Sequence, residues 1–199
     1  MIMFLPLSMN SMTSGFIYSF SYKNPLTVET NAGLLVLNIN KDETVKVDMG
    51  VPDFEPSKIP LNLNQVSPEY EIEGHMVGSL SIGNPHAILI QDEITDIDDI
   101  ASKIQSSELF PEGVNVGFMK VLNKNEIQLR VVERGVGETL ACGSGACAAV
   151  VAAARRELTE RQVSVVLNGG TLEIEWRDDN HVLMTGPTEL SFTGTWMLS

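Results

Sequence analysis

Residues 133–149 read ERGVGETLACGSGACAA, and this stretch decides how the rest of the chain is interpreted. It places Cys142 directly before a Gly-Ser-Gly turn, which leads into a run of small, apolar residues. Such a run, apolar on every side for about two turns, predicts a buried helix over 145–158. Gly143, Ser144 and Gly145 then present backbone N–H groups at the helix start. Unpaired donors and the positive end of the helix dipole favour a carboxylate or an oxyanion there.

The same field stabilises a thiolate, so we expect Cys142 to have a lowered pKa and to act as a base or nucleophile near neutral pH. The alternative is a small buried residue after a strand. Glu133 and Arg134 weigh against it, because they place a charged pair where the strand over 127–132 ends. Charged residues at a strand end are often simply exposed to solvent. An arginine at such a position is nevertheless able to bind a carboxylate through two hydrogen bonds. Cys147 falls inside the helix and is interpreted as a core residue.

Two further stretches carry candidate site residues. GNPHAI, at 83–88, predicts a turn with the side chains of Asn84 and His86 free at its lip. EGVNVGF, at 112–118, gives Asn115 a comparable position at a strand start. The alternative interpretations are a satisfied turn asparagine and a surface histidine.

Short segments of alternating polarity, separated by turn residues, predict an α+β fold. Spacing of apolar residues predicts one amphipathic surface helix over 94–105. We expect curved, largely antiparallel strands around the buried helix. Three prolines in 51–60 indicate a domain boundary near Leu61. The predicted hairpins are 32–50, 114–133 and 164–176, and further strands are predicted over 70–74, 75–82, 87–91, 181–186 and 190–198.

Composition excludes several classes of function. The 199 residues include 13 basic and 26 acidic side chains, a net charge of −13, and no cluster of Lys or Arg suits a nucleic-acid backbone. Two cysteines five positions apart offer no disulfide framework, which suits a cytoplasmic protein. The apolar N-terminus lacks a basic start and is interrupted by polar residues, so we expect no membrane span, with a signal-like relic as the alternative.

Cofactor and metal motifs are weak or missing. GSGACA fits the dinucleotide fingerprint G-x-G-x-x-A, but the expected hairpins do not form the βαβ unit that this motif needs. The three histidines show no ligand spacing with the cysteines. We therefore expect neither a metal nor a cofactor.

With GNPH, VNVGF and ERGVGETLACGSGACAA in this order, the chain closely resembles the diaminopimelate epimerase family from Leu26 to nearly its C-terminus. The long third motif is highly specific, and the other two support it. The proline racemase group shares the fold and the thiol chemistry, but this combination of motifs favours diaminopimelate over generic racemisation. The resemblance implies a curved, mainly antiparallel sheet wrapped around a buried central helix.

The resemblance also implies an isomerase that converts LL-diaminopimelate to the meso form without pyridoxal phosphate, on the route to lysine and peptidoglycan. In that family two cysteines face opposite sides of the α-carbon; one removes a proton as thiolate and the other returns one as thiol. Cys142 matches one of these cysteines. The other matches are Glu133 and His86 near the reaction centre, Asn84, Asn115 and Glu133 as polar substrate ligands, Arg134 for the distal carboxylate, and Gly143 and Ser144 for the α-carboxylate.

The chain departs from the family pattern in its first half. Family members have two similar halves, each with a helix headed by a cysteine motif, and the first motif, of the CGNGARC kind, does not occur here. We therefore expect residues 1–60 to be an incomplete N-terminal half, with an atypical segment at 1–24 and closing strands at 25–60. Residues 61–189 are then a complete C-terminal domain, and 190–199 a strand that returns to the N-terminal half.

Inversion needs a proton donor on the face opposite the base, and Cys147 lies more than a turn along the same helix. The sequence therefore predicts an epimerase with little or no activity alone. The alternatives are a non-catalytic truncated relic or amino-acid-binding module, and a structural partner that completes another chain. Uncovered strand faces lead us to expect that the N-terminal segment folds over the gap, or that two chains pair as a homodimer.

Overall fold

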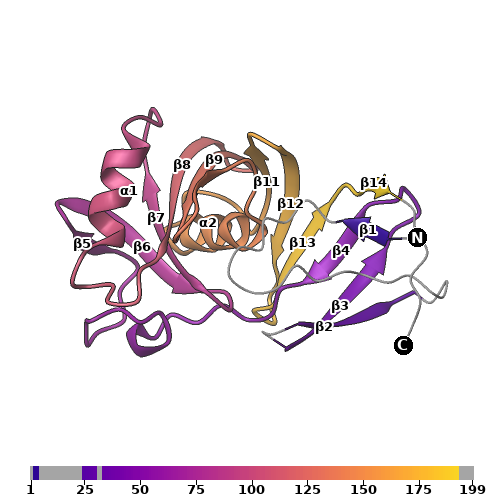
Figure 1. The fold of residues 1–199 in the computed structure, drawn as a ribbon, viewed down its shortest axis with the longest axis horizontal. Helices are drawn as coiled ribbons and strands as arrows, with labels where there is room; N and C mark the ends of the chain where they lie inside the picture. The colour runs from indigo at the N-terminus through magenta and orange to yellow at the C-terminus, as the bar shows by residue number, and fades with distance from the viewer. Residues whose placement is uncertain (1, 5–23, 31–32, 193–199) are drawn as a thin grey trace.

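The computed structural model describes residues 2–4, 24–30 and 33–192. A long mixed sheet curves around one helix, and a second helix lies on the outer side of the sheet (Figure 1). The α+β architecture predicted from the sequence is confirmed. The elements are β1 (Ile2–Phe4), β2 (Leu26–Thr30), β3 (Gly33–Ile39), β4 (Val45–Asp48), a 3₁₀ turn (Pro56–Lys58), β5 (Tyr70–Ile72), β6 (His75–Ser81), β7 (Pro85–Ile90), α1 (Ile97–Gln105), β8 (Asn115–Asn123), β9 (Glu126–Glu133), β10 (Gly137–Thr139), α2 (Gly143–Arg155), β11 (Gln162–Leu167), β12 (Gly170–Trp176), β13 (Val182–Gly186) and β14 (Glu189–Phe192).

The strands of the long sheet run in the order β2-β3-β4-β13-β12-β11-β9-β8-β7-β6-β5, with β10 paired to β9. Only the β7–β8 and β9–β11 pairs among the described strands are parallel. The three predicted hairpins form as β3–β4, β8–β9 and β11–β12. Strand β10 was not predicted; it occupies part of the segment between β9 and the Gly-Ser-Gly turn.

Helix α2 lies at the centre of the curved sheet (Figure 1). Its residues from Gly145 to Ala153 are all buried, as the run of small apolar side chains predicts. Small residues on both elements let helix and sheet approach closely, since a Cβ on Gly78 of β6 would lie 3.3 Å from the Ala152 Cβ. The buried central helix of the prediction is confirmed.

A second apolar cluster lies between α1 and the outer side of the sheet. Ile97, Ile100 and Ile104 are buried beneath α1, whereas Asp98 and Asp99 are exposed. Strand β7 serves both clusters, because successive side chains of a strand point to opposite faces. Its residues Ala87 and Leu89 belong to the cluster under α1, and Ile88 belongs to the cluster around α2. Coverage of both faces explains why β7 reads as a continuous apolar run.

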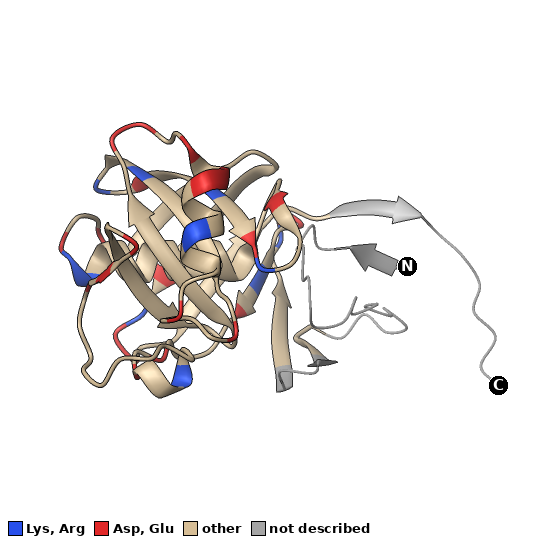
Figure 2. Cartoon of the chain, turned by 60° about the vertical axis from the view of Figure 1, so that its left-hand side comes forward, with Lys and Arg blue, Asp and Glu red and all other residues tan. Residues whose placement is uncertain are grey.

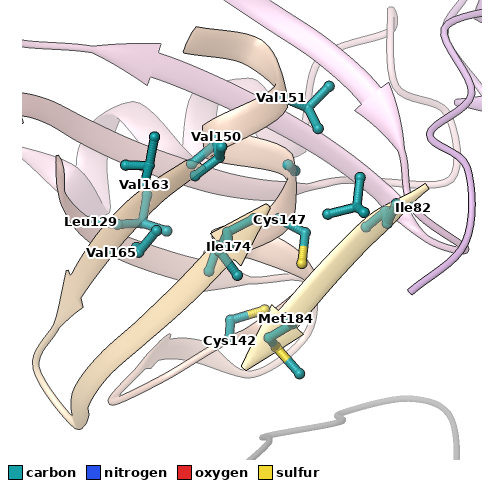
Figure 3. Packing of buried hydrophobic residues seen from close by; sticks show 14 of the residues in the cluster. Ile82, Leu129, Cys142, Cys147, Val150, Val151, Val163, Val165, Ile174 and Met184 are labelled. Atoms are coloured by element: carbon teal, nitrogen blue, oxygen red, sulfur yellow. The ribbon is translucent and has the colours of Figure 1, made fainter. Parts of the chain in front are cut away.

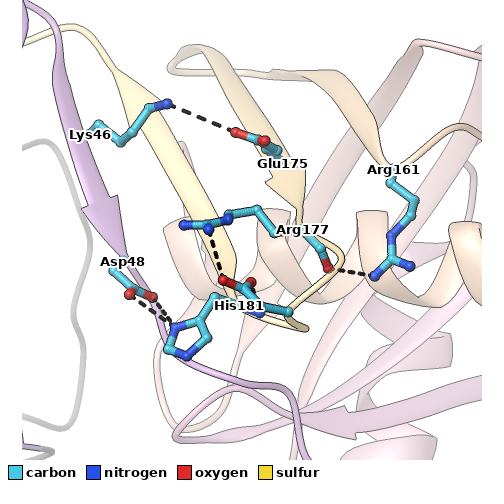
Figure 4. Close-up of polar contacts among 7 residues, drawn as sticks. Lys46, Asp48, Arg161, Glu175, Arg177 and His181 are labelled. Carbon is cyan, nitrogen blue, oxygen red and sulfur yellow. Dashed lines mark hydrogen bonds and ion pairs between the residues drawn. The ribbon is translucent and has the colours of Figure 1, made fainter.

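Strands β2 to β4 continue the long sheet through the pairing of β4 with β13. Polar contacts support this seam (Figure 4). Lys46 of β4 reaches Glu175 of β12 at 3.8 Å, and both oxygens of Asp48 lie 3.0 Å from Nδ1 of His181. The division near Leu61 stays a prediction.

The ends of the described chain meet in a separate two-stranded sheet. Strand β1 pairs antiparallel with β14. The predicted atypical segment at 1–24 and the predicted returning strand at 190–199 otherwise lie largely outside the described residues. On β3, Val36 and Ile39 are 40% and 41% exposed, which leaves apolar surface on this part of the sheet.

Charged residues are dispersed over the described surface. Figure 2 shows Asp and Glu spread over loops and helix turns, with the Lys and Arg positions separated from one another. Dispersed basic side chains do not form the continuous stripe that a phosphate backbone requires. None of the helices in the described ranges is both long and apolar enough to span a membrane.

The seam between β4 and β13 predicts a dependence of stability on pH. The hydrogen bond to Asp48 and the charge of that carboxylate raise the pKa of His181, Asp179 adds to the effect, and Arg177 opposes it. A raised folded-state pKa stabilises the protein fully below the unfolded value, near pH 6.5, and the effect is lost as pH rises through the folded value. We therefore expect His181→Gln to lower the free energy of unfolding at about pH 6 and to have little effect at about pH 9.

Urea unfolding of the wild type and His181→Gln at both pH values measures this difference. Asn180→Gly, beside His181 and without a titrating group, is the control, because glycine tolerates the positive φ of 68° at this position. An equal loss for His181→Gln at both pH values would show that His181 acts through packing and not through its charge.

Candidate active site

The site is built on the first turn of α2. Cys142 is the residue before the helix, with an extended backbone (φ −133°, ψ 106°), and its carbonyl accepts the first helical hydrogen bond from Ala146 at 2.9 Å. Its Sγ lies 3.6 Å from Oγ of Ser144, and the backbone N–H of Gly145 donates toward the sulfur. The helix start therefore directs its free donors at the Cys142 thiol, as the sequence predicts.

The predicted lowering of the pKa of Cys142 is wrong. Burial raises the pKa of Cys142 to about 11, and the nearby charge of Glu133 raises it further, while Ser144 and the Gly145 N–H act in the opposite direction. The side chain is only 1% exposed. Loss of water around the sulfur thus outweighs the helix-terminus field, and Cys142 is a neutral thiol at physiological pH.

Glu133 is the last residue of β9 and is 4% exposed. Thr139 of β10 donates its hydroxyl hydrogen to Oε1 of Glu133 at 2.6 Å. Strand β10 brings these residues together by folding back on β9. Sequence reasoning missed Thr139; the signal available was that a buried carboxylate needs hydrogen-bond donors nearby.

Asn115 joins the ends of three strands. It stands opposite His86 in the parallel β7–β8 register, and its Nδ2 donates to the Pro85 carbonyl at 3.1 Å. Its Oδ1 accepts the backbone N–H of Arg134 at 2.9 Å. Asn115 is 6% exposed, and its hydrogen bonds link β7, β8 and the end of β9.

His86 is not free at the lip of a turn, in contrast to the prediction. It is fully buried in β7, its Nε2 lies 3.0 Å from Oδ1 of Asn84, and its Nδ1 has no hydrogen-bond partner in the structure. Burial lowers the pKa of His86 to about 3, so the imidazole is neutral at physiological pH. The strand position explains the correction, because Pro85 already begins β7 and turns the next side chain inward.

The guanidinium of Arg134 is held by backbone carbonyls. Its Nη1 donates to Glu112 at 2.7 Å and to Gly113 at 3.4 Å. Gly113, at φ 69°, permits this contact, because a Cβ there would lie 2.9 Å from Cδ of Arg134. A bound carboxylate would have to compete with these carbonyls for the guanidinium.

Cys147 belongs to the core and not to the site. It is fully buried in the cluster around α2, among residues that include Ile82, Ile174 and Met184 (Figure 3). Burial raises the pKa of its thiol. Its interpretation as a small core residue is confirmed.

The structure thus places the predicted residues in two linked groups. The first surrounds the helix start, the second joins the strand ends, and the Glu133–Arg134 peptide connects them. The first group is Cys142, Gly143, Ser144 and Glu133; the second is Asn84, His86, Asn115 and Arg134.

A hollow of about 480 Å³ elsewhere on the molecule contains none of these residues. Its lining includes Arg161 and Trp176, which stack with 4.0 Å between the guanidinium and the ring centroid. Arg161 also donates to the carbonyls of Trp176 and Arg177. Figure 4 shows the second of these contacts. The Arg161 guanidinium is thus engaged by its own neighbours. Within the described ranges, no three side chains of the metal-binding types cluster together.

Known proteins share the sequence pattern and the fold of this chain. A family model described as diaminopimelate epimerase matches residues 78–191, which include every residue of both groups. The chain belongs to the diaminopimelate epimerase family. The diaminopimelate epimerases of Vesicomyosocius okutanii and Nitrosomonas eutropha are 47% and 45% identical to it over 178 and 186 residues, covering 88% and 89% of this chain. The alignments cover 66% of each of these relatives, so the chain spans about two thirds of their length.

Solved structures share the fold at low identity. A PhzF-family protein from Clostridium difficile superposes with a TM-score of 0.58 at 13% identity, covering 88% of this chain and 66% of that protein. A hydroxyproline epimerase from Agrobacterium vitis gives 0.54 at 15% identity, covering 85% and 58%. These likenesses place the chain among proteins with the diaminopimelate-epimerase-like fold.

For this member of the diaminopimelate epimerase family, we expect Cys142 to react slowly with iodoacetamide at about pH 8 and faster as pH approaches 11, because only the thiolate reacts. Glu133→Gln removes a neighbouring negative charge and should lower the pKa of Cys142, raising its alkylation rate at about pH 8 several-fold. Mass spectrometry of the alkylated peptide across a pH series measures both effects. Burial should leave Cys147 unmodified.

Glu126→Gln, at the far end of β9, is the matched control and should leave the profile unchanged. Rapid alkylation of the wild type at about pH 7 would show that the helix start dominates over burial after all.

Proposed function

We propose that this chain carries one half of a two-base diaminopimelate epimerase site, in which Cys142 exchanges a proton with the α-carbon of the substrate. The observation that supports this most is the position of Cys142, buried directly before α2 with Ser144 and the Gly145 N–H turned toward its sulfur. Membership of the family supplies the reaction class. The substrate is LL-diaminopimelate and the product the meso form.

The protonation state of Cys142 determines whether this residue donates or removes a proton in the reaction. A neutral thiol returns a proton to a carbanion, whereas removal of a proton requires the thiolate. With its pKa at about 11, Cys142 rests as the proton donor. A bound α-carboxylate at the start of α2 would accept hydrogen bonds from the N–H groups of Gly143 and Ser144.

The remaining residues bind the substrate in this proposal. Glu133 and Asn115 supply polar contacts near the reaction centre, and Asn84 with His86 lines the neighbouring strand ends. Arg134 binds the distal carboxylate after release from the carbonyls of Glu112 and Gly113. The neutral His86 hydrogen-bonds and does not transfer protons near neutral pH.

Full epimerisation needs a second acid or base on the opposite face of the α-carbon. The sequence contains two cysteines, and Cys147 is buried in the core on the same helix. This observation favours little or no epimerase activity for the chain alone, and it also supports the alternative function of an amino-acid-binding module of the same fold.

Proton NMR in D₂O tests the proposal. LL- and meso-diaminopimelate are incubated separately with the protein over a pH series that approaches 11, because removal of the α-proton requires the thiolate form of Cys142. We expect loss of the α-proton signal that increases with pH, without formation of the other stereoisomer, since one sulfur exchanges a proton on one face only. Cys142→Ser should abolish the exchange, and Cys147→Ser is the matched control that retains it.

Binding without exchange, seen as broadening of the diaminopimelate signals, would instead support the amino-acid-binding module. Rapid conversion of LL- to meso-diaminopimelate would show that a second acid is present and would overturn the proposal of a half-site.

A further inference from the structure

Residues 134–142, here called the Cys142 loop, join β9 to α2. The Cys142 thiol lies at the end of this segment. The hairpin turn between β11 and β12, formed by Asn168 and Gly169, packs against this segment from outside. None of the predicted site residues lies in that turn.

Gly169 makes the closest approach. Its N–H donates to the Leu140 carbonyl at 2.7 Å. A Cβ at this position would lie 3.0 Å from the Leu140 carbonyl oxygen, 3.2 Å from the carbonyl carbon and 3.3 Å from the Ala141 Cβ. Backbone atoms do not swing aside as a flexible side chain does, so any larger residue at 169 must displace the two residues that precede Cys142.

Asn168 reaches the same segment through Glu138. Its Nδ2 donates to Oε1 of Glu138 at 3.3 Å, and Arg130 binds both oxygens of that carboxylate at 2.7 and 2.8 Å. Bidentate arginine–carboxylate pairs fix orientation as well as distance. Glu138 is thereby held by β9 on one side and by the turn between β11 and β12 on the other.

Strand alternation connects this outer contact to the buried site. Glu138 and Thr139 are neighbours in β10, so their side chains point to opposite sides. Glu138 faces Arg130 and Asn168, while Thr139 donates to the buried Glu133. A shift of β10 at Glu138 therefore moves the hydroxyl that holds Glu133.

We propose that the turn formed by Asn168 and Gly169 positions the Cys142 loop, so that both Cys142 and Glu133 are held in place for proton transfer. Asn168 and Gly169 are positioning residues and do not touch the substrate. The inference rests on the proposed function for its catalytic consequence, but its structural consequence is measured on the Cys142 thiol itself.

The experiment compares Gly169→Ala and Asn168→Ala with the wild type. Asn125→Ala is the matched control, because Asn125 lies in another hairpin turn, between β8 and β9, and its exposed amide donates to the Gln162 carbonyl at 3.2 Å. The readouts are the pH profile of Cys142 alkylation by iodoacetamide, the rate of α-proton exchange with diaminopimelate in D₂O, and the melting temperature.

We expect a displaced loop to admit water to the sulfur and lower its apparent pKa, raising the alkylation rate about tenfold at pH 8 for Gly169→Ala, which corresponds to about one pKa unit. Exchange should fall by about tenfold or more, since misplacement by about 1 Å costs up to 10²-fold. Asn168→Ala should show smaller changes of the same sign, and Asn125→Ala none.

If both variants fold and keep the wild-type alkylation profile, the positioning role is overturned, even where their melting temperatures fall. Should Gly169→Ala fail to fold, Asn168→Ala decides, because it removes one exposed hydrogen bond and introduces no clash. A wild type that shows no exchange would count against the proposed function only, since the alkylation profiles still test the positioning.

Discussion

The enclosure of α2 by the sheet is the constraint on which the rest of the structure depends. A helix surrounded by strands must be apolar on all sides and small where the strands come close, which the run from Gly145 to Ala153 satisfies. Gly145 is closely confined, because a Cβ there would lie 3.1 Å from Val131 and 3.2 Å from Sγ of Cys142. A polar reactive group cannot stand within such a helix at low cost. The chemistry is therefore restricted to the helix start, where Cys142 stands.

That same enclosure sets two physical effects against each other at the thiol. The start of α2 and the Ser144 hydroxyl stabilise a negative sulfur, whereas burial and the Glu133 carboxylate destabilise it. Burial is the largest contribution, so the thiol remains protonated. A substrate carboxylate at the helix start would add a further negative charge and keep the thiol neutral more strongly still. The arrangement thus suits a group that gives a proton more readily than one that takes it.

Much of the fold follows from local pattern. The period-two alternation of 114–133 and the turn residues at 168–170 predict their hairpins, and the small apolar run predicts α2, because these elements are specified by nearby residues. The side-chain environments at the site were harder to predict. The inward turn of His86 depends on the parallel pairing of β7 with β8, and the pKa of Cys142 depends on how much of the sheet covers it. Both result from contacts between residues far apart in the sequence.

The geometry of α2 also separates the two cysteines by function. Residues five positions apart along a helix are separated by more than a full turn, so their side chains point in different directions. Both cysteines belong to the buried cluster around α2, but Sγ of Cys142 lies 3.6 Å from the Ser144 hydroxyl at the helix start, whereas Cys147 lies in the body of the helix. If an α-carbon binds at the helix start, a proton delivered to its far face must come from atoms on the opposite side of the substrate. Helix α2 cannot supply such atoms, because its body extends away from that side into the sheet. In the proposed half-site, α2 therefore supplies one acid on one face, and the stereochemical outcome would depend on what occupies the other.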